Sequence, residues 1–321
     1  MNTNFDLMND LGKKRIPFLF VVSFDASEVL VWPLDQVDSS AIQYVFPGHS
    51  LVGKSLKNNE PLQFDIQPCD EDRYAKAFDL VQYHLHYGDS FLLNLTMPTR
   101  VDTNYSLLDI FHSAKARYKL WLKDQFVVFS PETFVTIKEG NIRSFPMKGT
   151  MDASVPDAEK KLLESEKELA EHYTIVDLIR NDLSLVAKNV RVERFRYIER
   201  LNTHRHTLLQ MSSEIVGDLP KDYHEHLGTI LSSMLPAGSI TGAPKKKTVE
   251  IIRQAENYER GFYTGVMGIF DGQNLDSAVM IRFLEQADNG LVYKSGGGIT
   301  TRSVCAEEYQ ELKDKIYVPI H

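Results

Sequence analysis

The sequence predicts an α+β fold built on largely antiparallel sheets. Apolar, β-branched runs intermix with amphipathic helical stretches, but they do not follow the regular βαβ rhythm of a parallel sheet. The chain shows no internal repeat or low-complexity tract. With 321 residues, of which 43% are hydrophobic and 25% charged, it is long enough to bury a substantial core without disulfides or structural metals.

The first 70 residues predict a small strand-rich lobe. Apolar runs at 18–24 and 28–32 indicate two paired strands, and the polar stretch 58–72 indicates a linker or an irregular crossing. We therefore expect two parts, a short lobe over residues 1–70 that contributes to the fold and a larger domain over residues 71–321.

The middle of the chain shows helical periods and short apolar runs. Helical periodicity predicts helices over 74–87 and 107–122. The apolar runs predict strands over 90–96, 126–130, 134–138 and 142–145. The turn signal Glu139-Gly140-Asn141 joins the last two strands into a hairpin, and a loop that contains Lys148 is expected to follow.

The second half predicts a similar mixture. The long charged, amphipathic stretch 155–179 predicts one helix, and the same periodicity predicts helices over 248–258 and 306–316. Alternating or continuous apolar runs predict strands over 266–270, 278–284 and 291–294.

Composition excludes several classes of partner. The net charge of −8 argues against a nucleic acid or an anionic membrane surface as the main partner. Only two cysteines occur, Cys69 and Cys305, far apart and without metal-ligand spacing, which fits a reducing cytoplasmic setting. The apolar run within residues 13–24 is too short for a membrane span, and no signal-peptide cleavage site follows it.

Two predicted helices carry the same pair of carboxylates three residues apart. Glu168 and Glu171 lie on one face of the first helix, and Glu308 and Glu311 on one face of the second. Two such faces opposed would offer the hard oxygen ligands that magnesium prefers. Glutamates at this spacing are also common on exposed helices, so ordinary surface polarity is the alternative.

Glycine-rich segments and one arginine are further candidates for a binding site. Residues 295–303 place three glycines after a predicted strand, where backbone N–H groups can form a nest for an anion. Residues 235–247 lack the G-K-[ST] of a phosphate loop, so nucleotide binding is not expected there. Arg282 stands in an apolar predicted strand, where a guanidinium usually meets a carboxylate of protein or ligand.

Seven motifs stand in a fixed order along the chain. They are SPE (130–132), PMKGT (146–150), ELAEHYTIVDLIRNDL (168–183), LPAGSITGAPK (235–245), RGFYTGVMG (260–268), IRF (281–283) and GGGITTRS…EEYQE…K (296–315). In this order they resemble the chorismate-utilising enzymes, which include anthranilate, aminodeoxychorismate, isochorismate and salicylate synthases. The resemblance extends roughly from Arg73 to Ile316. It implies a fold like that of anthranilate synthase component I, with the chorismate-binding catalytic domain in residues 71–321.

The resemblance also implies roles for individual residues. It implies a magnesium ion held through Glu171 and Glu311, with Glu168 and Glu308 holding metal-bound waters or a second position. Glu132 matches the general acid that helps the ring hydroxyl of chorismate to leave, a role that suits a poor leaving group. The residues that it implies for substrate binding are Thr150, Thr241, Tyr263, Arg282, Gly297, Gly298, Lys315 and Gln210.

Lys148 distinguishes between members of this family. Lysine is typical of aminodeoxychorismate synthases at this position, where most other members have alanine. The resemblance implies that Lys148 acts as a nucleophile on the ring, for which its amine must be neutral. From the sequence alone, a lysine beside glycine and threonine is also typical of a surface turn.

Two positions depart from the family pattern. Leu92 stands where isochorismate-forming members have a lysine base and amine-forming members usually have glutamine, so activation of water is not expected. Gln210 stands where the family usually has a histidine. Glutamine can donate a hydrogen bond but cannot shuttle protons, so it is not expected to act as acid or base.

The expected activity is therefore that of an aminodeoxychorismate synthase component I. Such an enzyme converts chorismate and ammonia to 4-amino-4-deoxychorismate in the folate branch, the ammonia coming from a separate glutamine amidotransferase (component II). The chain shows no amidotransferase Cys/His/Glu set of its own. Two alternatives are an anthranilate synthase component I, which would also eliminate pyruvate, and a chorismate-binding relative without turnover.

Overall fold

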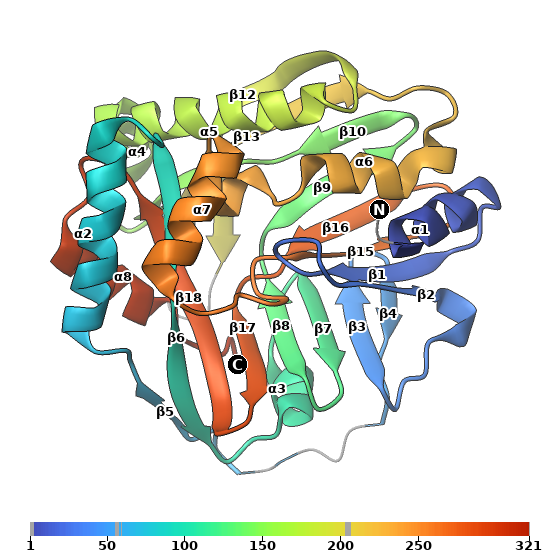
Figure 1. Ribbon diagram of the computed structural model, residues 1–321, viewed down its shortest axis with the longest axis horizontal. Helices are drawn as coiled ribbons and strands as arrows, with labels where there is room; N and C mark the ends of the chain where they lie inside the picture. The colour runs from blue at the N-terminus through green and yellow to red at the C-terminus, as the bar shows by residue number, and fades with distance from the viewer. Residues whose placement is uncertain (1–2, 55–57, 59, 203–206, 321) are drawn as a thin grey trace.

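The fold consists of two antiparallel sheets with helices around them. The structure is a computed structural model that describes residues 3–54, 58, 60–202 and 207–320 (Figure 1). Each sheet has nine strands in this described part of the chain. Every pairing between these strands is antiparallel, which confirms the α+β class with antiparallel sheets.

The first sheet combines strands from both ends of the chain. In spatial order its strands are β11 (Met147–Asp152), β13 (Thr207–Asp218), β10 (Asn141–Ser144), β9 (Thr133–Lys138), β16 (Leu275–Val279), β15 (Val266–Phe270), β1 (Phe18–Val22) and β2 (Val29–Pro33). The long strand β12 (Lys188–Asn202) pairs with β13. The predicted pair in the first 70 residues is thus present as β1 and β2, and β15 continues the sheet beyond β1.

The second sheet carries the strand with the three glycines. Its strands in spatial order are β14 (Gly242–Ala243), β6 (Leu92–Thr103), β18 (Gly290–Ile299), β17 (Phe283–Ala287), β8 (Phe126–Ser130), β7 (Tyr118–Leu122), β3 (Ile42–Phe46) and β4 (His49–Leu51). The short strand β5 (Phe64–Gln67) pairs with β6. One buried cluster joins the two sheets, with Leu19 and Met267 from the first and Tyr44, Tyr118 and Phe283 from the second.

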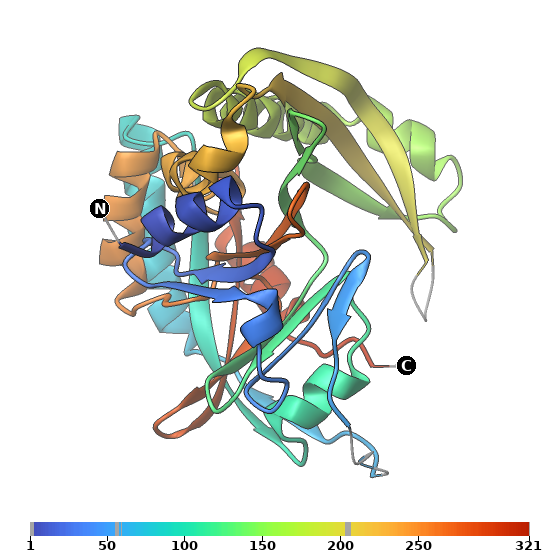
Figure 2. The same ribbon diagram turned by 90° about the vertical axis from the view of Figure 1, so that its right-hand side faces the viewer.

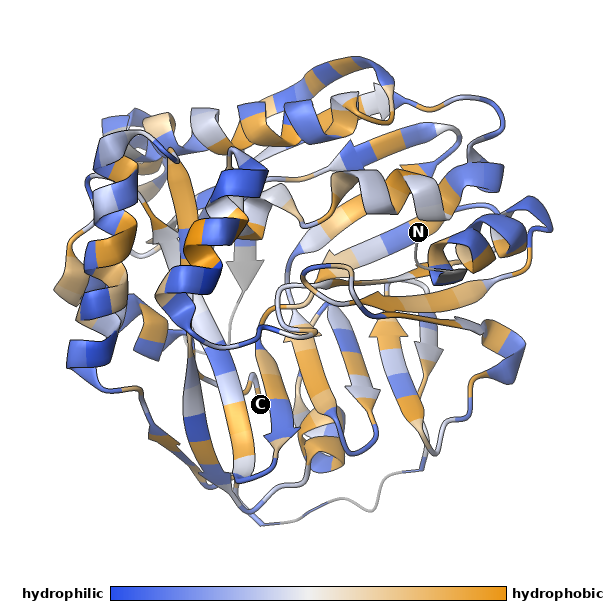
Figure 3. Ribbon diagram, viewed as in Figure 1, coloured by the Kyte–Doolittle hydropathy of each residue, from blue (hydrophilic) through white to orange (hydrophobic). Residues whose placement is uncertain are grey.

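Helices cover the outer faces of both sheets. They are α1 (Thr3–Lys13), α2 (Glu71–Tyr87), α3 (Leu107–Ser113), α4 (Ala158–Glu164), α5 (Glu166–Ser184), α6 (Leu227–Met234), α7 (Lys245–Glu256) and α8 (Cys305–Asp314), with single 3₁₀ turns η1 (Leu34–Gln36), η2 (Tyr223–His226) and η3 (Gly238–Ile240). Figure 3 shows β1 in unbroken orange, in keeping with its full burial, whereas α5 alternates orange and blue. In Figure 2 the hairpin β12–β13 and the helices α4 and α5 lie together at the top. The predicted division at residue 70 remains a prediction.

Several predicted elements are corrected by the structure. The helix predicted over 107–122 ends at Ser113, and β7 follows, because Tyr118, Leu120 and Leu122 fill a buried face between β3 and β8. The helix predicted over 155–179 is divided into α4 and α5, since the Ser165 hydroxyl caps α5 by accepting a hydrogen bond from the Glu168 N–H. The polar stretch 58–72 contains the strand β5.

Three further corrections concern the site. Lys148 lies on the strand β11 rather than in a loop. The strand predicted over 278–284 is interrupted, and Arg282 lies between β16 and β17 with a left-handed backbone (φ 55°). Gly296, Gly297 and Gly298 belong to β18, where they pair with β6, so they do not form the predicted nest after the strand. Helices α1 and α6 and the hairpin β12–β13 were not predicted.

Candidate active site

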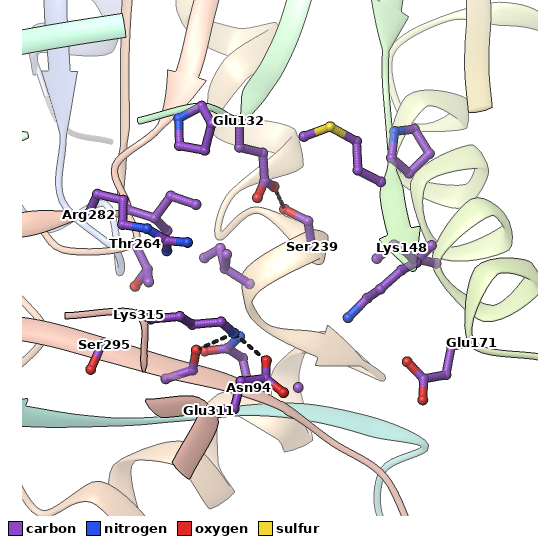
Figure 4. A pocket seen from close by; sticks show the side chains of 18 of the residues that line it. Asn94, Glu132, Lys148, Glu171, Ser239, Thr264, Arg282, Ser295, Glu311 and Lys315 are labelled. Carbon is purple, nitrogen blue, oxygen red and sulfur yellow. Dashed lines mark hydrogen bonds and ion pairs between the residues drawn. The ribbon is translucent and has the colours of Figure 1, made fainter. Parts of the chain in front are cut away.

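A cavity of about 500 Å³ opens between the two sheets and the helices α5 and α8. Most of the residues predicted for the site line it, although they come from segments far apart in the sequence (Figure 4). The predicted residues on its wall are Glu132, Lys148, Glu168, Glu171, Gln210, Tyr263, Arg282, Gly298, Glu308, Glu311 and Lys315.

Lys148 extends its amine into the cavity from β11 (Figure 4). In the described part of the chain no carboxylate forms an ion pair with it. A Cβ at Gly298 would lie 3.4 Å from the Lys148 Nζ, so this glycine leaves space around the amine. His172 lies behind this strand, where burial and the charges of Arg196 and Lys148 lower its pKa to about 4 and keep the imidazole neutral. The amine therefore faces the cavity and forms no salt bridge among the described residues.

Glu132 faces Lys148 across the cavity. Its Oε1 accepts a hydrogen bond of 2.7 Å from the Ser239 hydroxyl (Figure 4). Burial raises the pKa of Glu132 above its ordinary value, although the Ser239 hydrogen bond and the charges of Lys148, Arg282 and Lys315 oppose that rise. A carboxyl group with a raised pKa holds its proton closer to neutral pH, which suits a general acid.

Besides Lys148 and Lys294, the cations Arg282 and Lys315 line the cavity and could bind an anionic ligand. Arg282 is held with its guanidinium 5.2 Å from the ring centre of Tyr317, and its buried Nε has no hydrogen-bond partner among the described residues. Lys315 Nζ lies 2.6 Å from Glu311 Oε1 and donates to the Gly296 carbonyl at 2.9 Å. Burial lowers the pKa of Lys315 despite Glu311. An orphaned guanidinium N–H at a cavity wall is a ready donor to a carboxylate ligand.

The four glutamates of the predicted metal site line the cavity from α5 and α8. The two on α8 pack against Gly297, where a Cβ would lie 3.3 Å from Glu308 Oε2 and 3.4 Å from Glu311 Oε1. On the α5 side, a Cβ at Gly149 would lie 2.9 Å from Glu168 Oε2. Within the described ranges no three acidic, histidine or cysteine side chains converge closely enough to bind a metal by themselves. This set of hard oxygen donors fits magnesium, which takes one or two carboxylates and completes its shell with water and ligand oxygens.

The remaining predicted residues have more varied places. Tyr263 is 3% exposed, and burial is the main cause that raises its pKa. Thr241 is fully buried, and its hydroxyl donates a hydrogen bond to the Ala237 carbonyl. It therefore stabilises the loop over residues 237–241 and does not line the cavity. The Thr150 backbone pairs with Gln210 across β11 and β13, and the Thr150 side chain lies outside the described part. Gly297 contributes backbone beside α8.

A buried ion pair fixes three segments of the cavity wall. Arg260 and Glu256 are 2% and 1% exposed, and Arg260 Nη2 lies 2.6 Å from Glu256 Oε1. The same guanidinium donates to the carbonyl oxygens of Asn94 at 2.7 Å and Ile240 at 3.2 Å, and to Thr264 Oγ1 at 3.2 Å. It therefore ties β6, the loop before β14 and the turn before β15 to one another.

Several residues on the cavity wall were not predicted as site residues. Those with polar side chains are Asn94, Ser239, Thr264, Lys294 and Ser295. Ser239 and Thr264 lie inside two of the seven motifs, so the sequence could have indicated them as candidate site residues. Lys294 lies within β18 and forms an ion pair of 2.8 Å with Glu285.

Comparison with known proteins agrees with this geometry. The sequence profile of chorismate binding enzymes matches residues 33–321. The chain belongs to the chorismate-binding enzymes. An uncharacterized PabA-like protein of Pasteurella multocida is 49% identical over 313 residues, which are 97% of each chain. Aminodeoxychorismate synthase component 1 of Klebsiella aerogenes is 34% identical over 266 residues, 78% of this chain but 57% of that longer protein.

Solved structures confirm the chorismate-binding fold. Anthranilate synthase component I of Streptococcus pneumoniae superposes with a TM-score of 0.68 at 25% identity, over 81% of this chain and 60% of that one. The menaquinone-specific isochorismate synthase of Escherichia coli gives a TM-score of 0.75 at 16% identity, over 96% of this chain and 79% of that one. None of the helices in the described ranges is long and apolar enough to span a membrane.

Leu92 gives this chorismate-binding enzyme an apolar wall beside Lys148. It is 7% exposed, and its Cδ1 would lie 3.2 Å from a Cβ at Gly298. Together with Lys148 and Glu171 it lines a second, smaller cavity of about 230 Å³. A leucine here can neither hold a water molecule by hydrogen bonding nor remove its proton.

Proposed function

We propose that this chorismate-binding enzyme is an aminodeoxychorismate synthase component I. Chorismate and ammonia would be its substrates, the ammonia coming from a glutamine amidotransferase subunit, and 4-amino-4-deoxychorismate its product. The observation that carries this proposal is Lys148, whose amine extends into the cavity opposite the Glu132 carboxyl. The product would lead to 4-aminobenzoate and folate.

The first step would join Lys148 to the substrate ring. The neutral amine attacks the ring carbon beside the carboxylate-bearing carbon, the double bonds shift, and the C–O bond of the ring hydroxyl breaks. Glu132 gives its proton to the departing oxygen, which leaves as water. Arg282 and Lys315 would bind the two carboxylates of chorismate during this step, since both place positive charge on the side of the cavity that faces Lys148.

The second step would release Lys148. Ammonia adds to the carbon that lost the hydroxyl, the double bonds shift back, and the C–N bond to Lys148 breaks, so the lysine leaves as a neutral amine. The proton of the new ammonium group passes to the Glu132 carboxylate, which restores the acid. Leu92 supports an amine rather than water as the second nucleophile, because its side chain offers no base for water.

Identification of the product tests this proposal. Purified protein, chorismate, magnesium and an ammonium salt at mildly alkaline pH are expected to give an aminated product that keeps its pyruvyl ether, measured by mass spectrometry. Added aminodeoxychorismate lyase should convert this product to 4-aminobenzoate. Anthranilate would instead identify an anthranilate synthase. Chorismate left unreacted, even with glutamine and a cognate amidotransferase, would identify a binding protein.

We also propose that magnesium binds through Glu171 and Glu311, with Glu168 and Glu308 next to it. When bound, the ion would supply positive charge to the substrate carboxylate and to the departing hydroxyl. We expect magnesium to raise the midpoint of thermal unfolding of the chelator-treated protein, and Glu311→Gln to reduce this rise. Glu307→Gln is the matched control, because Glu307 is exposed on the same helix. Equal shifts in both variants would exclude Glu311 from the metal site.

A further inference from the structure

We infer that Ser239 is a positioning residue that orients the Glu132 carboxyl, and that an Asp182–Lys245 clamp holds Ser239 in place. This inference rests on the proposed role of Glu132 as the general acid. Ser239 is the second residue of η3, and its hydroxyl donates to Glu132 Oε1 at 2.7 Å inside the cavity. The hydroxyl thereby fixes one carboxyl oxygen and leaves the other available to carry the proton.

The loop that carries Ser239 is attached to helix α5. Asp182 of α5 forms an ion pair of 2.7 Å with Lys245 through its Oδ1, and its Oδ2 is buried against the Gly238 backbone. Lys245 Nζ also donates to the Met234 carbonyl at 2.6 Å, at the other end of the loop. A Cβ at Gly238 would lie 2.7 Å from Asp182 Oδ2, so only glycine allows this close approach.

The clamp is largely shielded from solvent, so removal of either partner would leave the other charge poorly compensated. The Lys245 and Asp182 side chains are 21% and 10% exposed. Helix α5 also carries Glu168 and Glu171. Helix α5 thus determines the positions of these proposed metal ligands. Through the clamp it also determines the position of Ser239, which donates the hydrogen bond to Glu132.

The charged groups around Glu132 determine the sign of the expected pH effect. Lys148 on β11, Arg282 between β16 and β17, and Lys315 after α8 all favour its ionised form, as the Ser239 hydrogen bond does, whereas burial favours the protonated form. Tyr263 faces the same cavity with a raised pKa and stays neutral. Loss of the Ser239 hydroxyl would raise the pKa of Glu132 further. A general acid must be protonated to act. The fall of kcat on the alkaline side of the kcat–pH profile should therefore move to higher pH.

Ser239→Ala tests this inference in the intact protein. We expect the plateau of kcat to fall about tenfold, because one positioning hydrogen bond is lost. We also expect the alkaline limb to move to higher pH and the KM for chorismate to stay unchanged. Ser239→Thr, which keeps the hydroxyl, should restore the limb to its wild-type position. Ser233→Ala is the matched control, because Ser233 is exposed on the neighbouring helix α6 and donates its hydrogen bond to the Thr229 carbonyl, away from Glu132.

Two outcomes would overturn the inference. A kcat–pH profile of Ser239→Ala that matches wild type would show that the hydroxyl does not act through Glu132. A raised KM with unchanged kcat would show that Ser239 binds the substrate instead. Asp182→Asn weakens the clamp without touching the cavity, so it should move the same limb in the same direction if the clamp positions Ser239. Glu132→Gln separates the two proposals, since a wild-type alkaline limb in that variant would contradict Glu132 as the acid.

Discussion

Replacing Lys148 with alanine is expected to lower kcat for 4-amino-4-deoxychorismate by at least about a hundredfold, which corresponds to about 2.7 kcal/mol of transition-state stabilisation. The amine lies at the cavity wall without a carboxylate partner in the described part of the chain, so its removal deletes the nucleophile and leaves the charged contacts to the substrate intact. The measurement is product formation from chorismate and ammonium, resolved by chromatography and mass spectrometry.

Lys148→Arg separates covalent from electrostatic action. Arginine keeps the positive charge but its guanidinium is not a nucleophile at neutral pH, so both variants should be similarly impaired if a bond forms. Rapid quenching of the wild-type protein before ammonia is added should reveal a mass increase equal to chorismate less one water, absent from both variants. An arginine variant with nearly full activity would contradict the covalent intermediate.

Local patterns in the sequence predicted the elements that are stabilised locally. Helical periodicity predicted α2 over 74–87, and the structure has it from Glu71 to Tyr87, where Asp70 caps its start and Gly88 ends it with a left-handed backbone. The hairpin β9–β10 was predicted from the turn signal at residues 139–141, and in the structure Glu139 and Gly140 adopt the positive φ that the turn requires. Such signals lie within a few residues of each other and need no information about the rest of the fold.

Elements that depend on distant partners were predicted less well. The stretch 118–122 reads as part of a helix until β3 and β8 are in place on its two sides. The glycines of β18 look like a flexible loop, yet their pairing with β6 fixes them as strand. In both cases tertiary packing overrides local preference, and a single sequence does not reveal which strands will meet.

In the site, too, features that depend on local sequence were predicted better than features that depend on distant contacts. The ordered motifs predicted charged and polar residues for the site, and the structure brings most of these together in one cavity. Ser239 and Arg260 were not predicted as site residues, because their hydrogen bonds to Glu132 and to the Asn94 backbone join segments that are far apart in the sequence. Thr241 shows the converse error. It stands in a motif but uses its hydroxyl inside the loop, which only the three-dimensional structure reveals.

Replacing Glu256 with alanine is expected to lower the free energy of unfolding by about 3–5 kcal/mol, the usual cost of leaving one member of a buried ion pair uncompensated. Arg260 and Glu256 are both almost fully buried, and although burial lowers the pKa of Arg260, the Glu256 carboxylate more than offsets this effect. Urea denaturation followed by circular dichroism measures the change. Glu250→Ala is the matched control on α7, where a half-exposed pair with Lys247 should contribute less than about 1 kcal/mol.

A double replacement distinguishes stability from positioning. In Glu256→Leu with Arg260→Met both charges are gone, so most of the lost stability should return. Activity should not return, since methionine cannot donate to the carbonyl oxygens of Asn94 and Ile240 that the guanidinium holds together. If the double variant regains both stability and wild-type kcat, the ion pair is needed only for folding. If it regains stability alone, these hydrogen bonds are what keep the two sides of the cavity in register for catalysis.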